Sequence, residues 1–205
     1  MTTFLKSRQL YEASILAYQG EQLYLEENKG QMTSDTPFAI ASISKLYTDA
    51  IVFKLIDQGK LTYDTGLTDI LPQEVTKHLP QAEQVTVRHL LDQISGFPNY
   101  EMDRQTNGKV LIDDLYKADR RVAFEDALEM IAELPAKSCL DGDKAYYADI
   151  NAMLLGKMAE TVTGQTAEQL LEHLICQPLQ LSQTHWGTGH EKLAPLYNGK
   201  QSIAF

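Results

Sequence analysis

The sequence predicts an α+β fold in which a mainly helical region packs on a partial antiparallel sheet. Two observations lead to this prediction: the amino-terminal segment has the composition of strands, and apolar residues recur at helical spacing through most of the chain after residue 40. The sheet is expected to be partial because two strands form at best a marginal hairpin, and further strands would normally come from later sequence.

The predicted hairpin covers residues 11–26. Residues 11–18 and 22–26 are short β-prone runs rich in Tyr, Ile and Leu, and Gln19-Gly20-Glu21 separates them. The chain is therefore expected to open with the first two strands of the sheet.

Residues 42–186 are predicted to be mainly helical. In the first helix, apolar residues recur at helical spacing from Ile43 to Ile56, and Gly59 ends the pattern, which places Ser42 at the start of the helix. The later helices are predicted at 87–93 with Thr86 as N-cap, at 121–134 before Pro135, at 151–162 before Gly164, and from Thr166 to Cys176 before Pro178.

Composition and charge limit the classes of function. With 205 residues, of which 43% are hydrophobic, the chain is long enough for one full domain, and residues 1–205 are predicted to form a single domain. The formal net charge of −10, without a block of Lys or Arg, argues against nucleic acid and anionic lipid as partners. No apolar run is long enough to span a bilayer.

The amino terminus lacks an apolar signal core, because Lys6 and Arg8 interrupt its first residues. As written, the chain is predicted to be cytoplasmic. A chain whose leader had been removed would look the same and would lie at the cell surface.

Neither a metal nor another cofactor is predicted. Cys139 and Cys176 do not make a disulfide framework and lack the spacing of a zinc site, so both are expected to be ordinary buried thiols. The histidines show no metal-like pairing; they are His78, His89, His173, His185 and His190.

Ser42-Ile43-Ser44-Lys45 has the form S-x-x-K, which places a hydroxyl and an amine on one face of a helix. A serine hydroxyl needs a base to become a good nucleophile, and a lysine can be that base only when it is neutral. Near pH 7 this requires the pKa of the lysine to fall about three units below its reference value of about 10.4. Burial and the positive end of the helix dipole both favour that state, and the Ser42 N–H can point at an oxyanion. Alone, however, the motif is weak, and an N-cap serine followed by a solvated lysine is the simpler interpretation.

Longer segments resemble a known family. Residues 36–45 closely resemble the nucleophile segment of the group that comprises class C β-lactamases, penicillin-binding proteins (DD-peptidases) and family VIII esterases. Residues 85–98 resemble its T-[IV]-R-H-L-L-x-x-x-S-G-[LF]-P segment, residues 147–164 its Y-S-[ND]…L-L-G…V-T-G block, and residues 178–184 its P-L-G-M…T segment. These segments occur in family order, so the resemblance implies a β-lactamase/DD-peptidase-like fold and serine hydrolase chemistry.

The resemblance implies a role for three residues. Ser42 would be the nucleophile that forms an acyl-enzyme, Lys45 would accept or share its proton, and Tyr147 would be the second acid/base. A phenol has a reference pKa of about 10, so it acts only beside an ammonium or through concerted proton transfer. The alternative for Tyr147 is an aromatic core residue with a satisfied hydroxyl.

Asp149 stands where many members of the family have Asn, and the resemblance makes it a substrate-binding residue. A carboxylate only accepts hydrogen bonds, so recognition of a substrate amide would change, and Lys45 would gain a countercharge that raises its pKa. This countercharge favours Tyr147 over Lys45 as the base.

The chain also departs from the family pattern. Asp141-Gly142 replaces Pro-Gly, Gln93 replaces a usual His, and no K-T-G or H-x-G strand is found to supply a second oxyanion donor. The literal match His185-Trp186-Gly187 comes too early to be that strand. We therefore expect a truncated domain: a fragment of a longer product, a pseudoenzyme, or a chain completed by a second copy in a homodimer through strand exchange.

Two functions are consistent with these expectations. The first is a serine hydrolase that forms an acyl-enzyme on an ester, a β-lactam or an acyl-D-amino acid, with a small-molecule or peptidoglycan-like substrate. The second is a catalytically impaired relative that acts as a binding or interaction module through the same cleft or an uncovered sheet edge.

Overall fold

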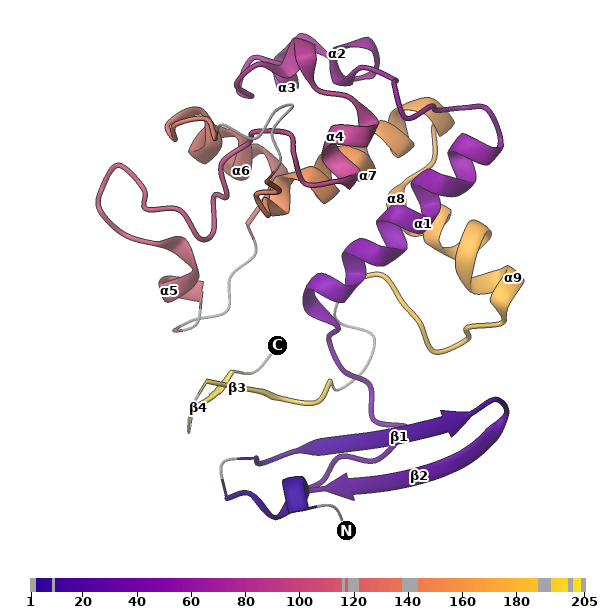
Figure 1. Ribbon diagram of the computed structural model, residues 1–205. Coiled ribbons are helices and arrows are strands. Elements are labelled where there is room, and N and C mark those ends of the chain that lie inside the picture. Colours follow the sequence, from indigo (N-terminus) through magenta and orange to yellow (C-terminus); the bar gives the residue numbers. More distant parts are fainter. Residues whose placement is uncertain are drawn as a thin grey trace. The chain divides into compact units, whose positions relative to one another are not determined.

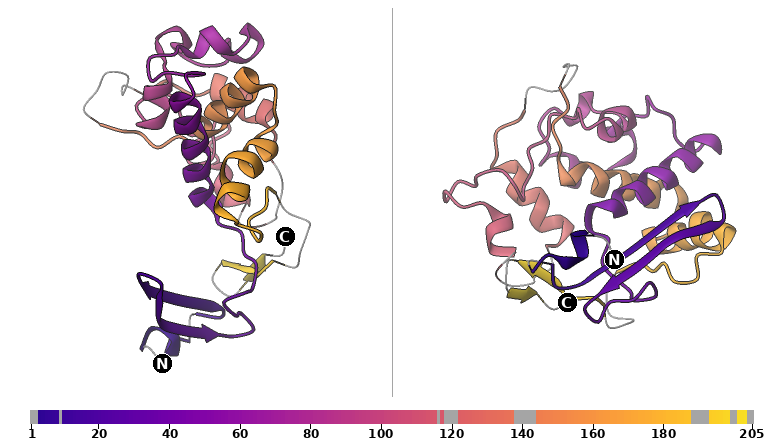
Figure 2. Two further views of the ribbon diagram at one scale, coloured as in Figure 1. Left: turned by 90° about the vertical axis from the view of Figure 1, so that its right-hand side faces the viewer. Right: turned by 60° about the horizontal axis from the view of Figure 1, so that its bottom comes forward.

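A computed structural model describes residues 3–8, 10–115, 117, 122–137, 144–187, 193–198 and 201–203. The chain divides into two units, each with its own internal contacts (Figures 1 and 2). The hairpin unit comprises Met1–Ile40, Tyr116–Asp119 and Gly187–Phe205, and the helical unit comprises Ala41–Leu115 and Arg120–Trp186. Helices and an antiparallel sheet make this an α+β chain, as the sequence predicts.

The hairpin unit contains the predicted amino-terminal hairpin. Strands β1 (Ala13–Gln19) and β2 (Gln22–Lys29) pair antiparallel, from Ala13 opposite Lys29 to Gln19 opposite Gln22. The turn requires a left-handed residue, which Gly20 supplies with φ 61°. The register that the turn sets holds for Gln19 and Tyr18, and a β-bulge between Ala17 and Tyr18 then shifts it for the rest of the ladder.

A second hairpin in the same unit was not predicted. Strands β3 (Leu196–Asn198) and β4 (Gln201–Ile203) pair antiparallel. The Tyr197 ring stacks on that of Tyr11 with 4.8 Å between centroids, so the two ends of the chain meet within this unit. A short 3₁₀-helix, η1 (Thr3–Lys6), also belongs to the unit.

The helical unit is built around two longer helices, α1 (Ser44–Asp57) and α7 (Asp149–Thr163), which contact each other. Its shorter elements are the 3₁₀-helices η2 (Ala41–Ile43) and η3 (Ala82–Gln84), the α-helices α2 (Leu67–Ile70), α3 (Gln73–Thr76), α4 (Val87–Leu91), α5 (Leu111–Leu115), α6 (Phe124–Ala132), α8 (Ala167–Leu171) and α9 (Gln177–Leu179), and the π-helix η4 (Glu172–Cys176).

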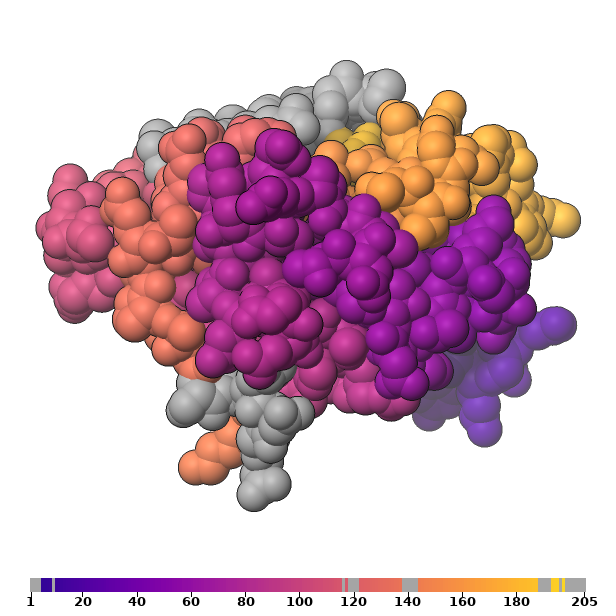
Figure 3. Space-filling view, turned by 90° about the horizontal axis from the view of Figure 1, so that it is seen from above, coloured from indigo at the N-terminus to yellow at the C-terminus, as the bar shows by residue number. Residues whose placement is uncertain are grey.

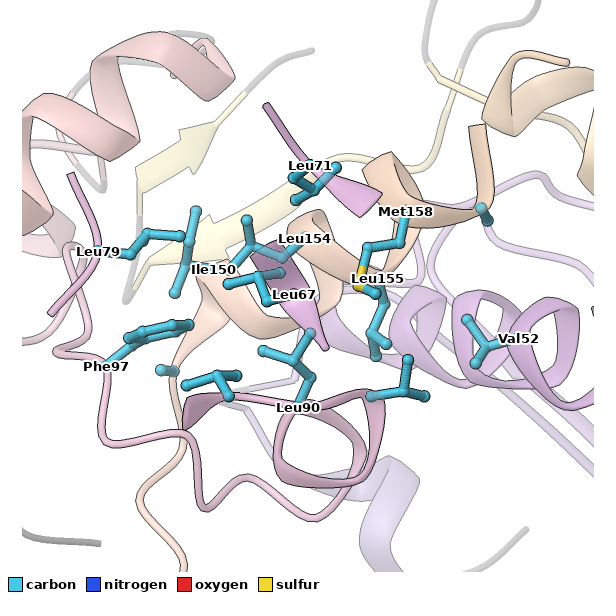
Figure 4. Packing of buried hydrophobic residues seen from close by; sticks show 14 of the residues in the cluster. Val52, Leu67, Leu71, Leu79, Leu90, Phe97, Ile150, Leu154, Leu155 and Met158 are labelled. Carbon is cyan, nitrogen blue, oxygen red and sulfur yellow. The ribbon is translucent and has the colours of Figure 1, made fainter. Parts of the chain in front are cut away.

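Helix α7 lies in the core of this unit because its apolar residues recur at helical spacing. Ile150, Leu154 and Met158 are fully buried, and Figure 4 shows Leu154 beside Ile150 and Leu67. Helix α4 packs against α7, with Leu90 among the buried side chains. Gly164, with φ 69°, ends α7 where predicted. The packing of α1 and α4 on α7 brings three distant parts of the sequence together.

The predicted helix after Thr166 continues further than expected. Thr166 caps α8 as predicted, since its side chain accepts a hydrogen bond from the Gln169 N–H at 3.2 Å. The prediction that the helix stops before Pro178 is wrong: η4 follows α8, and α9 includes Pro178. Pro178 lies in the first turn of α9, directly after the π-turn in which the Gln177 N–H bonds to the Glu172 carbonyl.

Two other predicted helices are present with shorter bounds, whereas α7 begins two residues earlier than predicted, at Asp149. Helix α4 begins after Thr86 but ends at Leu91 instead of Gln93, because the backbone at Gln93 is left-handed with φ 58°. Helix α6 lies within the predicted 121–134 segment, although Arg121 itself lies outside the described residues.

Segments that are distant in the sequence lie on one face of the helical unit. Figure 3 shows residues from its first half, in purple and magenta, on the same face as the helices after residue 150, in orange. No helix in the part of the chain that the structure describes is long and apolar enough to cross a lipid bilayer.

Candidate active site

Three side chains meet at the start of α1. The Lys45 ammonium donates a hydrogen bond to Ser42 Oγ at 3.0 Å, and the Tyr147 hydroxyl donates to the same oxygen at 3.0 Å. The predicted convergence of these groups is therefore present in the structure. The site combines a hydroxyl, an ammonium and a phenol within proton-sharing distance.

Ser42 lies in η2, the 3₁₀-turn that leads into α1. The residue before it, Ala41, has a left-handed backbone with φ 46°, which is unfavourable for a residue with a Cβ atom. Lys45 follows Ser42 by three residues, so the helical turn holds its side chain on the face where Ser42 lies. The local backbone thus aims both groups in the same direction.

Asp149 supplies the countercharge expected for Lys45. Its Oδ1 lies 2.6 Å from Lys45 Nζ, and the two side chains are 12% and 20% exposed. Burial alone would lower the pKa of Lys45, but hydrogen bonding and charge from Asp149, with a smaller contribution from Tyr147, outweigh it and raise this pKa. Lys45 is therefore an ammonium at neutral pH.

The backbone around Tyr147 is held from one side by Gln93. The Gln93 carbonyl accepts from the Tyr146 N–H at 2.8 Å, and its side-chain Oε1 accepts from the Ala148 N–H at 3.0 Å. The same Oε1 accepts from Asn151 Nδ2 at 2.8 Å. One residue thus bonds to the chain on both sides of Tyr147.

Asn99 holds the same segment through a different set of bonds. Its side-chain amide donates to the Tyr147 carbonyl and to Asp149 Oδ2, both at 3.1 Å. Its Oδ1 accepts from the N–H groups of Glu101 and Met102, at 3.0 and 3.2 Å. Asn99 is 1% exposed, so these bonds satisfy a buried amide and tie the loop after Pro98 to the site.

Asp103 anchors this loop further. It accepts a hydrogen bond from the Tyr146 hydroxyl, pairs with Lys137 at 2.9 Å, and accepts from the Asn99 N–H at 2.8 Å. The polar connection from Asn99 to Lys109 is thus bonded to the residue next to Tyr147.

A comparison with protein families agrees with this geometry. The family model described as Beta-lactamase matches residues 1–202. The chain belongs to the beta-lactamase family.

Two relatives of this beta-lactamase family member have different names. A protein of Escherichia coli (strain K12), provisionally named a D-alanyl-D-alanine carboxypeptidase, is 31% identical over 164 residues, which are 78% of this chain and 36% of that protein. Penicillin-binding protein 4 of Amycolatopsis lactamdurans is 28% identical over 153 residues, which are 75% of this chain and 37% of that protein. The chain therefore spans little more than a third of the length of these relatives.

A solved structure shows the same fold. The penicillin-binding protein of Bacillus halodurans superposes with a TM-score of 0.67 at 26% identity, over 91% of this chain and 60% of that chain. This likeness places the present chain with the structures of the beta-lactamase and penicillin-binding-protein group.

Other sequence predictions for this beta-lactamase family member concern residues away from the site. His185 and Trp186 lie in an irregular segment and not in a strand, consistent with the exclusion of an H-x-G match there. Cys176 is buried, as expected, whereas Cys139, Asp141-Gly142 and His190 lie outside the described residues. Within the described ranges, no three His, Cys, Asp or Glu side chains form a group that could hold a metal ion.

The residues that support the site are harder to recognise in the sequence than the reacting groups. Gln93 stands out there only as a departure from the family pattern, and Asn99, Asn151 and Asp103 were not predicted. Asn99 follows Phe97 and Pro98 in a buried segment, and a polar residue in such a place needs partners. That is the signal that could have identified it.

Glu101 adds a further carboxyl group close to the site. Burial and the charge of Asp149 raise the pKa of Glu101, and they outweigh the opposing effects of Tyr100 and Lys45. The positive charge of Lys45 is thus surrounded by more than one acidic group.

Proposed function

We propose that this chain carries the acylation site of a serine hydrolase, with Ser42 as nucleophile, Tyr147 as the group that takes its proton and Lys45 as the cation that stabilises the developing negative charge. The observation that carries the proposal is that both groups contact the same oxygen, each at 3.0 Å. A hydroxyl with a structural role alone does not require an ammonium from its own helical turn and a phenol from 105 residues away on the same oxygen.

In the proposed reaction, Ser42 Oγ attacks the carbonyl carbon of an ester or amide, and the carbonyl electrons move to its oxygen. Tyr147 accepts the Ser42 proton and gives one to the leaving group, so that an acyl-enzyme forms as the bond from the carbonyl carbon to that group breaks. An alcohol or amine then departs, whereas the amine of a β-lactam stays attached in the opened ring. Two hydroxyls can exchange donor and acceptor roles, so the Tyr147 contact can carry a proton in either direction. Water then releases the acid and restores Ser42.

Lys45 is proposed to act through its charge. Asp149 and Tyr147 keep its pKa raised, so at neutral pH it cannot take the proton from Ser42. An ammonium 3.0 Å from Ser42 Oγ stabilises negative charge that develops on that oxygen and on the Tyr147 oxygen. The base in this scheme is Tyr147, because the negative charge of Asp149 keeps Lys45 protonated.

The Ser42 N–H is the proposed donor to the oxyanion. The first N–H groups of a helix have no intrahelical acceptor, and Ser42 precedes the first α-helical residue, Ser44. Asp149 is proposed to bind substrate as well, since each carboxylate oxygen has capacity beyond its contact with Lys45 or Asn99.

The proposed substrates are esters, β-lactams and acyl-D-amino acids. Relatives named as a D-alanyl-D-alanine carboxypeptidase and as a penicillin-binding protein favour an acyl-D-amino acid or a β-lactam, which are cleaved at a carbonyl carbon. A peptidoglycan-like peptide is the natural substrate class that fits both names.

Labelling with two reagents tests the proposal. A fluorophosphonate reports the nucleophile without requiring recognition of a particular acyl group, and a fluorescent penicillin reports the substrate class. We expect both to label the wild type and neither to label Ser42→Ala. Ser44→Ala is the matched control, because Ser44 lies two residues away on the same turn. Absence of labelling by the fluorophosphonate at every pH from about 6 to about 10, which reaches the reference pKa values of a lysine and a phenol only at its upper end, would refute the proposal.

A further inference from the structure

Gln93 bonds to the polypeptide on each side of Tyr147. Its backbone carbonyl accepts from the Tyr146 N–H at 2.8 Å, and its side-chain oxygen accepts from the Ala148 N–H at 3.0 Å. The two bonds bracket Tyr147, whose hydroxyl reaches Ser42 Oγ, 105 residues away in the sequence. The position of this hydroxyl therefore depends on a backbone segment that Gln93 fixes at two points.

The backbone of Gln93 has an unusual conformation at this contact. Its φ of 58° is left-handed, a conformation that a residue with a Cβ atom adopts at a cost. This conformation ends α4 two residues earlier than the sequence predicts. Both the carbonyl and the side chain of Gln93 then bond to the segment from Tyr146 to Ala148.

The side chain of Gln93 is also suited to its partners. Both groups that face its Oε1, the Ala148 N–H and the Asn151 Nδ2 group, are donors, so the facing atom has to be an oxygen with two lone pairs. The partner Asn151 is fully buried and is itself held, because its Oδ1 accepts from the Ser95 hydroxyl at 2.7 Å. The partner of Gln93 is therefore itself held by a buried hydrogen bond.

We propose that Gln93 is a positioning residue for the reaction: by bracketing the chain on both sides of Tyr147, it sets the Tyr147 hydroxyl on Ser42 Oγ. This inference rests on the proposed function and assigns a role in it to a residue outside the reacting groups. Gln93 acts through the acceptor capacity of its side-chain oxygen. A side chain of similar size without that oxygen removes the role, and one that keeps the oxygen retains it.

Three variants separate positioning from stability. Gln93→Leu removes the acceptor, Gln93→Glu keeps an oxygen in the same place, and Ile131→Val is a matched destabilising control in the buried core. The measurement is the rate of fluorophosphonate labelling as a function of probe concentration. For Gln93→Leu, the maximal rate is expected to fall about 10- to 100-fold with little change in the half-saturating concentration, because a small displacement of a reacting group has that effect. Gln93→Glu restores most of the rate, and Ile131→Val keeps it.

Amide hydrogen exchange provides a readout that does not depend on labelling. The Ala148 N–H is expected to lose protection in Gln93→Leu and to keep it in Gln93→Glu. If Gln93→Leu labels at the wild-type rate although its Ala148 N–H has lost protection, the positioning role of Gln93 is wrong and the proposed function stands. Failure of the wild type to label would instead overturn the proposed function, and with it the catalytic consequence assigned to Gln93.

Discussion

Asp149 Oδ1 lies 2.6 Å from Lys45 Nζ, and this ion pair sets the charge at the point where Ser42 is held. Because Lys45 also donates to Ser42 Oγ, a change in the charge of Asp149 reaches the proposed nucleophile through the Lys45 side chain. The pair joins the first turn of α1 to the first residue of α7. Its consequences can be measured on the lysine, on stability and on the rate of labelling.

Replacing Asp149 by Asn is expected to lower the pKa of Lys45. Burial of Lys45 opposes its charge, and Asp149 is the largest of the effects that outweigh this burial. Titration of the Lys45 side chain by NMR in the wild type and in Asp149→Asn checks the prediction. Equal titration of Lys45 in both would contradict it.

The same substitution also identifies the base. If neutral Lys45 took the proton from Ser42, fluorophosphonate labelling of Asp149→Asn would rise at lower pH than in the wild type, in step with the lowered lysine pKa. We expect no such displacement, because Tyr147 is the proposed base. A labelling profile that follows the Lys45 titration would assign the proton to the lysine instead.

Stability at alkaline pH should depend on Lys45. Its pKa is raised in the folded protein, so its contribution is complete below the unfolded value of about 10.4 and is lost as the pH rises through the higher folded value. Between about pH 9 and 12, the free energy of unfolding of the wild type should therefore fall more steeply than that of Lys45→Met. Urea denaturation at a series of pH values measures both slopes.

Lys157→Met serves as the control for this experiment. Its ion pair with Glu160 is largely exposed, at 45% and 27%, and such pairs contribute about 0–1 kcal/mol. Its alkaline slope should match that of the wild type. If Lys45→Met also matches the wild type, Lys45 does not have a raised pKa.

Asp103→Asn is expected to destabilise the loop that holds Tyr146. Burial alone would raise the pKa of Asp103, but hydrogen bonds from Tyr146, Lys137 and the Asn99 N–H outweigh it and lower this pKa. A lowered pKa in the folded protein stabilises the fold at pH values above the pKa of the unfolded chain, which is about 3.9. This contribution is lost as the pH falls through the pKa of the folded protein. The variant should lose about 1–3 kcal/mol at pH 6 and approach the wild type in acid.

Asp64→Asn is the matched control, because its side chain is 91% exposed and lies 4.0 Å from Arg88. Its free energy of unfolding should change by no more than about 0.5 kcal/mol. A cost at Asp103 as small as that at Asp64 would show that the loop does not depend on its carboxylate.

The sequence predicted the reacting groups better than their support. Spacing alone places Ser42 and Lys45 on one helical turn, so their contact follows from local geometry. Tyr147 lies 105 residues away from Ser42 and could be named only through the family resemblance. The effect of Asp149 on Lys45 was predicted from charge, and the structure confirms its direction.

The bonds that hold Tyr147 could not be read from local sequence. Gln93 and Asn99 contact the segment from 146 to 149 across about fifty residues, and no periodicity in either stretch indicates which backbone groups they meet. The predicted ends of two helices were wrong for a related reason. The left-handed backbone of Gln93 and the π-turn before Pro178 depend on tertiary contacts, which helix propensity does not describe. The hairpin at 196–203 was short enough to be overlooked.

Asn99→Asp should be strongly unfavourable at neutral pH and should recover in acid. In the wild type, Asn99 Nδ2 donates to Asp149 Oδ2 at 3.1 Å in a site where Asn99 is 1% exposed. An aspartate there brings two carboxylates together, which raises the pKa of one of them. A carboxyl with a raised folded pKa costs stability above that pKa, and this cost disappears as the pH falls through it.

Comparison with Asn99→Ala separates charge from hydrogen bonding. Asn99→Ala leaves the Tyr147 carbonyl and two N–H groups without their partner, at about 1–3 kcal/mol for each buried group, and this cost should change little with pH. Urea denaturation of both variants from about pH 7 down to pH 4, the range in which a raised carboxyl pKa falls, should therefore show Asn99→Asp gaining stability relative to Asn99→Ala. Parallel curves for the two variants would mean that the carboxylates of Asp149 and the new aspartate do not face each other, and that Asn99 supports Tyr147 without touching the Lys45 ion pair.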